Sequence, residues 1–305
     1  MYLNRFRYKK IKEIYLKFLE SQEIYSEPFR DKNNQFKNFY FPISKNIYKD
    51  FIKNKKTKII GLTGGQGSGK STISKILKII LKGGFNLNVT IFSIDDFYKT
   101  FKERKIMSLK VSPLFKTRGV PGTHDTTLLL KTLKKLKSTK FKKILIPKFD
   151  KSIDDRVAKK KWQCVKHKPD IVIFEGWCVG ASAQKNKDLI KPINSLEKKK
   201  DVKKTWRGKV NHELKKKYRQ IFNLIDTNIF LKVPSFQYVY KWRLLQEKKL
   251  RLHSNGKKIM SDDQVKEFIM YYERITRHML KNFSKKAKYV ISIDKGHRLK
   301  SIKIK

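Results

Sequence analysis

The stretch Gly61-Leu62-Thr63-Gly64-Gly65-Gln66-Gly67-Ser68-Gly69-Lys70-Ser71-Thr72 decides the fold of this chain. From Gly64 to Ser71 it follows the phosphate-binding pattern of a glycine, any four residues, then Gly-Lys-Ser. The apolar run 59–62 leads into the pattern and the segment 73–80 follows it, so strand, glycine turn and helix come in the required order. We therefore expect a nucleotide phosphate site here rather than a glycine turn without a ligand.

The residue types in this loop suit the binding of ATP. Glycines let backbone N–H groups approach phosphate oxygens, and the helix that begins near Gly69 adds free donors at its N-terminus. Lys70 would reach the β- and γ-phosphates, and the Ser71 hydroxyl would bind Mg²⁺. The residues expected to contact ATP are Gly64, Gly65, Gln66, Gly67, Ser68, Gly69, Lys70, Ser71 and Thr72.

The length and composition indicate a folded α/β protein. The chain has 305 residues, of which 39% are hydrophobic and 12% aromatic, and no low-complexity linker divides it. Residues 1–56 are expected to form a helical N-terminal extension, with Ile11, Ile14, Tyr15 and Leu19 at helical spacing. Residues 57–305 are expected to form the nucleotide-binding domain.

The formal net charge of +49 is interpreted as solvated lysine rather than as a nucleic-acid surface. Arginine accounts for only 13 of the 75 basic residues, which leaves 75 − 13 = 62 lysines, spread from end to end. Specific nucleic-acid surfaces depend more on arginine, which binds phosphate and guanine with two hydrogen bonds. We expect no specific nucleic-acid partner, although the positive field would attract anionic substrates.

Cysteine use and hydropathy suggest the cytoplasm. Cys164 and Cys178 are too few for a disulfide framework and lack zinc-site spacing. No apolar stretch is long enough to span a membrane, and the first residues lack the apolar region of a signal peptide. We expect a cytoplasmic protein without a membrane partner. Monomer and homodimer both remain open.

Carboxylates follow two of the expected strands. Asp95 and Asp96 come after the expected strand 88–94, and Glu175 follows the apolar run 171–174. Such positions face the ligand crevice of an open α/β sheet. One of the adjacent aspartates can accept a substrate proton while its neighbour caps a helix, and Glu175 is the candidate for the Mg²⁺ side.

Further polar candidates lie in loops and on a late helix. Arg118, His124 and Asp125 can hold a small polar substrate, or Asp125 or Thr126 can simply cap the helix that follows. Arg243 lies on an expected helix 235–252 and is either a lid residue over the phosphates or a solvated side chain.

The remaining segments complete the predicted layout. The helix after the loop is expected to stop at Gly83-Gly84, and in the polar segment 182–215 only Trp206-Arg207 stands out. A capping box at 261–264 predicts the start of a helix, which carries an apolar stripe from Val265 to Phe283. Alternating strands and helices predict a P-loop-type, mostly parallel β-sheet flanked by helices, with the helical N-terminal extension and a lid.

Several motifs together resemble a known family. They occur in order at residues 64–72, 95–98, 118–125, 149–156, 174–177, 239–247 and 260–265. This set resembles the bacterial D-glycerate 3-kinase family, which is similar to plant glycerate kinase and belongs with the uridine kinase, phosphoribulokinase and pantothenate kinase group of P-loop kinases. The resemblance runs from about residue 61 to the C-terminus, and the first 56 residues match only loosely.

The resemblance implies transfer of the ATP γ-phosphate to the primary hydroxyl of D-glycerate, giving 3-phosphoglycerate. It implies Asp95 as general base, Lys70 as the group that stabilises the transferred charge, and Ser71 and Glu175 as the residues that manage Mg²⁺. The acceptor site would contain Arg118, His124, Asp125 and Arg156, with Arg243 on the lid. Two alternatives stay open: a kinase of the same fold for a nucleoside or pantothenate, and a nucleotide-binding protein that acts on nucleic acid.

Overall fold

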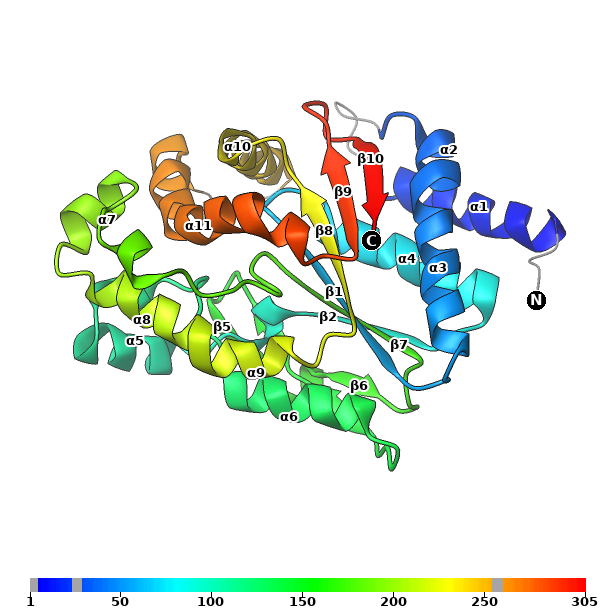
Figure 1. Ribbon diagram of the computed structural model, residues 1–305, viewed down its shortest axis with the longest axis horizontal. Coiled ribbons are helices and arrows are strands. Elements are labelled where there is room, and N and C mark those ends of the chain that lie inside the picture. The colour runs from blue at the N-terminus through cyan, green and yellow to red at the C-terminus, as the bar shows by residue number, and fades with distance from the viewer. Residues whose placement is uncertain (1–4, 24–28, 254–259) are drawn as a thin grey trace.

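A six-stranded sheet forms the centre of the protein in the computed structural model, which describes residues 5–23, 29–253 and 260–305. Its strand order is β10-β9-β8-β1-β7-β2 (Figure 1). All neighbours pair in parallel except β10 and β9, which are antiparallel at one edge. The predicted mostly parallel sheet is thus confirmed. Its strands are β1 (Lys58–Gly64), β2 (Val89–Ser93), β7 (Ile171–Gly176), β8 (Thr227–Lys232), β9 (Tyr289–Ile293) and β10 (Leu299–Ile304).

Helices cover both faces of this sheet, which explains the continuous apolar runs within its central strands. All six residues of β7 are buried. Ile171 and Ile173 belong to one hydrophobic cluster and Val172 and Phe174 to another, because successive side chains of a strand point to opposite faces.

One face of the sheet is covered by the helix after the phosphate loop and by the N-terminal helices (Figure 1). Buried Tyr15 and Leu19 belong to the same cluster as the core of the sheet, whereas Ile14, placed by its spacing on the same stripe, is 43% exposed. The elements on this side are α1 (Arg5–Glu20), α2 (Lys32–Gln35), the π-helix η1 (Phe36–Tyr40), α3 (Phe41–Ile52) and α4 (Lys70–Phe85).

The other face is covered by helices from the middle and the end of the chain (Figure 1). The elements are η2 (Ile94–Phe97), α5 (Phe101–Lys110), η3 (Pro113–Lys116), α6 (Thr126–Lys137), η4 (Lys159–Lys161), η5 (Asn186–Leu189), α7 (Ser195–Lys200), α8 (Thr205–Glu213), the π-helix η6 (Leu214–Tyr218), α9 (Arg219–Phe222), α11 (Asp262–Asn282) and η7 (Phe283–Lys285). The remaining helix, α10 (Phe236–His253), follows β8. The predicted capping box at Ser261 is present at the start of α11.

Two short antiparallel pairs lie outside the main sheet. β3 (Ile144–Ile146) pairs with β6 (Gln163–Val165), and β4 (Phe149–Asp150) pairs with β5 (Asp155–Arg156). The second pair is named the 149–156 hairpin here. Its turn and strands carry several charged residues.

The predicted end of α4 at Gly83-Gly84 is wrong. The helix continues through both glycines to Phe85 and ends at Asn86, whose φ of 54° lies in the left-handed region. Asparagine tolerates this conformation, and the Asn86 and Leu87 N–H groups donate to the carbonyls of Lys82 and Leu81, at 3.1 Å each. The carbonyl of Gly83 accepts a hydrogen bond from Arg7 on α1, at 2.8 Å.

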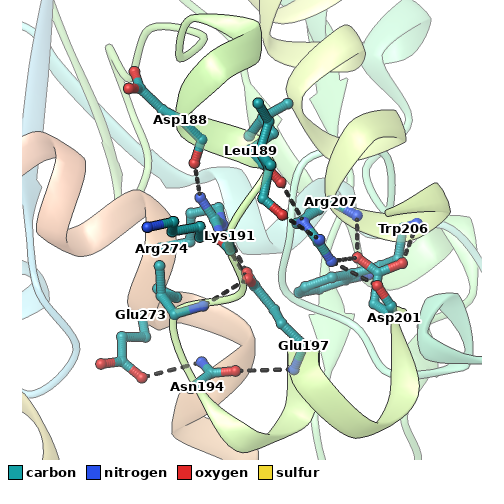
Figure 2. A network of polar contacts seen from close by, with 12 residues as sticks. Asp188, Leu189, Lys191, Asn194, Glu197, Asp201, Trp206, Arg207, Glu273 and Arg274 are labelled. Atoms are coloured by element: carbon teal, nitrogen blue, oxygen red, sulfur yellow. Dashed lines mark hydrogen bonds and ion pairs between the residues drawn. The ribbon is translucent and has the colours of Figure 1, made fainter. Parts of the chain in front are cut away.

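The polar segment 182–215 is held by two buried arginines (Figure 2). Arg274 of α11 donates to both oxygens of Glu197, at 2.7 and 2.6 Å, and to the carbonyls of Asp188 and Lys191. Arg207 donates to Asp201 at 2.9 Å and to the carbonyl of Leu189 at 2.8 Å. These contacts pin the stretch 188–201 to α8 and α11.

Candidate active site

The phosphate-binding loop joins the end of β1 to the start of α4. Gly67 and Gly69 have φ values of 74° and 83°, which glycine adopts readily. A Cβ atom on Gly67 would lie 2.8 Å from that of Trp242 on α10, so the close approach of that helix also requires glycine. Within the described chain, the buried Oε1 of Gln66 and Oγ of Ser68 have no hydrogen-bond partner, which fits a loop built to contact a ligand.

Lys70 lies over this loop. Its ammonium donates to the carbonyls of Gly64 and Gly65, at 3.1 and 3.0 Å. Burial lowers the pKa of Lys70, while the charges of Glu175 and Asp95 act in the opposite direction. Lys70 therefore lies near both candidate carboxylates.

Ser71 and Glu175, the two candidates for Mg²⁺, are in direct contact. The Ser71 hydroxyl donates to Oε1 of Glu175 at 3.0 Å. The register of β1 against β7 sets Glu175 beside Leu62, just before the loop. Burial raises the pKa of Glu175, and the charge of Lys70 opposes this effect. One hydroxyl and one carboxylate, completed by nucleotide phosphates and water, are donors that suit Mg²⁺.

The adjacent aspartates have different partners. Asp96 accepts a hydrogen bond from the backbone N–H of Ser93, at 3.1 Å, and so closes the capping box of η2. Asp95 accepts instead from the Tyr98 hydroxyl at 2.9 Å and from the ammonium of Lys151 at 2.7 Å. Burial alone would raise the pKa of Asp95, but the charge and hydrogen bond of Lys151 outweigh it and lower the pKa to about 2.

The candidate acceptor residues Arg118, Asp125 and Arg156 meet around the 149–156 hairpin. Arg118 pairs with Asp154 in the turn of the hairpin. Arg156 donates to the carbonyl of Tyr98 at 2.7 Å and to Asp125 at 3.1 Å. Asp125 also accepts from the backbone N–H of Leu128 at 3.0 Å, so it caps α6, as one of the two sequence interpretations had it.

His124 lies behind Tyr98 and is only 1% exposed. The two rings stack with centroids 4.5 Å apart, and Nδ1 of His124 lies 2.5 Å from the Tyr218 hydroxyl. Burial lowers the pKa of His124 to about 3, so the ring is neutral at physiological pH. The structure therefore places His124 as a buried support of Tyr98, which in turn contacts Asp95.

Arg243 lies on α10, the helix that packs on the loop through Trp242. Its guanidinium pairs with buried Glu247 and lies 5.7 Å from the centroid of the Phe268 ring. The predicted contact of Arg243 with phosphate stays a prediction, and this arginine does not have the environment of a solvated side chain.

Sequence reasoning missed Lys151 and Asp154, which hold Asp95 and Arg118. Both residues lie in one of the motifs that carry the resemblance. In a chain with 62 lysines, however, one more lysine in a polar turn gives no separate signal, and only the fold brings it to Asp95.

Residues 59–239 match the family described as Phosphoribulokinase / Uridine kinase family. The chain belongs to this family. An uncharacterized kinase of Schizosaccharomyces pombe, mug58, is 36% identical over 230 residues, which cover 70% of this chain and 78% of that protein. The chloroplastic D-glycerate 3-kinase of Arabidopsis thaliana is 31% identical over 223 residues, covering 70% of this chain and 46% of that protein.

The fold also matches a solved structure, that of a D-glycerate 3-kinase from Cryptococcus neoformans. The TM-score is 0.75 at 23% identity, with coverage of 88% of this chain and 99% of the other. The protein is therefore a P-loop kinase that acts on ATP and a small molecule. Across its described helices, none is both long and apolar enough to cross a membrane.

Proposed function

We propose that this kinase transfers the γ-phosphate of ATP to the primary hydroxyl of D-glycerate and so forms 3-phosphoglycerate. The observation that carries the proposal is the convergence of Asp95, Arg118 and Arg156 on the 149–156 hairpin. Glycerate offers one carboxylate and two hydroxyls, so its site needs cations for the former and a base for the latter. Two relatives named D-glycerate 3-kinase support the same acceptor.

In this reaction Asp95 accepts the proton of the primary hydroxyl while the hydroxyl oxygen attacks the γ-phosphorus. The new O–P bond forms as the bond between the γ-phosphorus and the β–γ bridging oxygen breaks, and ADP leaves with that electron pair. Lys70 stabilises the negative charge of the transferred group.

Ser71 and Glu175 would hold Mg²⁺ at the edge of the loop. When bound there, the ion would neutralise negative charge on the phosphates. The Ser71–Glu175 hydrogen bond supports this assignment because it shows that the two donors reach one point.

An acceptor screen tests the proposal. Purified enzyme is given MgATP with D-glycerate, L-glycerate, uridine or pantothenate, and ADP formation and the phosphorylated product are both measured. We expect D-glycerate to give the highest kcat/KM. The Lys70→Ala variant is the negative control, because it should stay folded and lose phosphoryl transfer. Preference for uridine or pantothenate would overturn the proposed acceptor, and wild-type turnover by Lys70→Ala would overturn the assigned site.

A further inference from the structure

Lys151 of the 149–156 hairpin blocks part of the carboxylate that the reaction needs. Its ammonium lies 2.7 Å from Oδ2 of Asp95, and the Tyr98 hydroxyl occupies Oδ1. Both oxygens of Asp95 therefore already accept a hydrogen bond from a charged or polar side chain. An acceptor hydroxyl can still reach a free lone pair of this carboxylate, but the ammonium of Lys151 lowers the pKa of Asp95 and so makes it a weaker base for as long as the pair persists.

Of the two donors, Lys151 is the one that can leave. Its side chain is 61% exposed, against 24% for Asp95, whereas Tyr98 is buried and stacked on His124. A lysine ammonium on its long stem reorients easily. Because the pair also lowers the pKa of Asp95, Lys151 leaves only when a competing anion replaces Asp95 as its partner.

The other cations of the hairpin region pair with carboxylates other than Asp95. Arg118 pairs with Asp154, and Arg156 pairs with Asp125. Lys148, in the same hairpin region, pairs at 3.2 Å with Asp96, which caps η2. Lys151 forms its hydrogen bond and ion pair with Asp95.

We propose that Lys151 senses the charge of the acceptor: it holds Asp95 when the acceptor site is empty, and the anionic group of an acceptor draws it off and frees Asp95. The carboxylate or phosphate of the acceptor then pairs with Lys151, and the acceptor hydroxyl takes the released position on Asp95. Water and neutral alcohols carry no anion to displace Lys151. They should therefore be poor acceptors, and ATP hydrolysis without an acceptor should be slow.

This inference rests on the proposed function for the choice of its probe, D-glycerate. Its chemistry is that of the transfer already written: the hydroxyl proton goes to Asp95, the O–P bond forms, and ADP leaves. Lys151 gains or loses no proton in the step. It changes only its partner, from the carboxylate of Asp95 to the anion of the acceptor.

The test compares D-glycerate with glycerol, which keeps the three carbons and the primary hydroxyl but has no charge. The quantity measured is the ratio of kcat/KM for D-glycerate to that for glycerol, together with ADP release without an acceptor. The variants are Lys151→Met, the conservative Lys151→Arg, and the control Lys148→Met, which removes a charge of similar exposure from the same region.

We expect Lys151→Met to lower the ratio by about 10- to 100-fold, the worth of a hydrogen bond to a charged group, while ADP release without an acceptor rises. Lys151→Arg should restore most of the ratio, and Lys148→Met should leave it within about twofold. An unchanged ratio in Lys151→Met, with both acceptors slowed equally, would show that Lys151 only supports the structure. An equal loss in Lys148→Met would overturn the inference as well.

The same measurement distinguishes failure of this inference from failure of the proposed function. If the wild type rejects D-glycerate, the same ratio is measured for the acceptor that the screen finds and for its uncharged analogue. An anionic acceptor with the expected ratio change keeps the role of Lys151 and removes only D-glycerate. A preferred acceptor without an anionic group overturns both.

Discussion

The Ser71 hydroxyl donates to Oε1 of Glu175 across 3.0 Å, although 104 positions separate the two residues in the chain. Parallel pairing of β1 and β7 brings their carboxyl ends to one edge, so the start of α4 faces the end of β7. The hydrogen bond joins the two side chains that are expected to hold Mg²⁺. It therefore defines the edge of the sheet on which the phosphates are expected to lie.

The first prediction concerns this pair. Glu175→Gln keeps an oxygen acceptor for Ser71 but removes the negative charge that favours Mg²⁺. We expect a 10- to 100-fold rise in the Mg²⁺ concentration needed for half-maximal activity, the usual effect of changing a group around a metal. Titration of activity with Mg²⁺ at fixed ATP measures it. Glu267→Gln removes an exposed carboxylate elsewhere and should change nothing, and an unshifted Glu175→Gln curve would exclude the assigned role.

The second prediction separates the adjacent aspartates. Asp95→Asn should lower kcat by about 10²–10⁴-fold, the worth of a positioned base, and leave ATP binding intact. Asp96→Ala should mainly lower the free energy of unfolding, by about 1 kcal/mol, because it removes the acceptor that closes the capping box of η2. Steady-state kinetics and urea unfolding of both variants measure this. Near wild-type kcat in Asp95→Asn would move the base to Asp96.

The third prediction concerns recognition of the acceptor by Arg118. Arg118→Ala should raise the KM for the acceptor by about 10- to 100-fold and leave the KM for ATP nearly unchanged, because the guanidinium would contact the acceptor anion and not ATP. Arg298→Ala, which removes an exposed arginine paired with Asp294, is the matched control. The kinetics are measured with each substrate varied in turn. Equal rises in both KM values would indicate a general disturbance of the hairpin instead.

The fourth prediction concerns the buried pair in Figure 2. Arg274→Ala leaves Glu197, whose side chain is 1% exposed, without its charged partner. We expect a loss of about 3–5 kcal/mol in the free energy of unfolding, the usual cost of stranding a buried charge. Lys200→Ala breaks an exposed pair with Glu267 and should cost about 0–1 kcal/mol. Urea unfolding compares them, and equal losses would contradict the expectation.

The fifth prediction follows from His124. Its pKa is about 3 in the folded state, because burial outweighs the nearby charge of Asp95, against 6.5 for an ordinary histidine. As the pH falls below 6.5, the unfolded chain therefore binds a proton that the folded chain refuses. The free energy of unfolding decreases until the pH approaches 3, by at most about 1.4 kcal/mol per pH unit.

The test compares the free energy of unfolding of the wild type and of variants between pH 7 and pH 4. His124→Gln should flatten the curve by the share that His124 contributes, whereas His212→Gln, at an exposed position, should leave its slope unchanged. A variant curve parallel to that of the wild type would show that His124 is protonated in the folded state.

Local patterns were sufficient for several elements. The loop from Gly64 to Ser71, the capping box at Ser261 and the apolar stripe of α11 are all where the sequence indicated. The reason is that each depends on residues within a few positions of one another. Even so, Gly83 and Gly84 misled the prediction of the end of α4, because Asn86 forms the left-handed cap instead.

What the sequence by itself determined is the phosphate loop, the parallel sheet class and the residue types placed at the ends of the strands. Only the tertiary structure decided which of Asp95 and Asp96 is a cap, that Lys151 holds the other, and that Arg274 and Arg207 fasten the segment 182–215. For Lys151 and Arg274 the physical reason is distance along the chain, because their partners lie 56 and 77 positions away. Charged groups dozens of residues apart meet only after strand order and hairpin docking are set, and in a lysine-rich chain no local pattern singles out the lysine that will meet its partner.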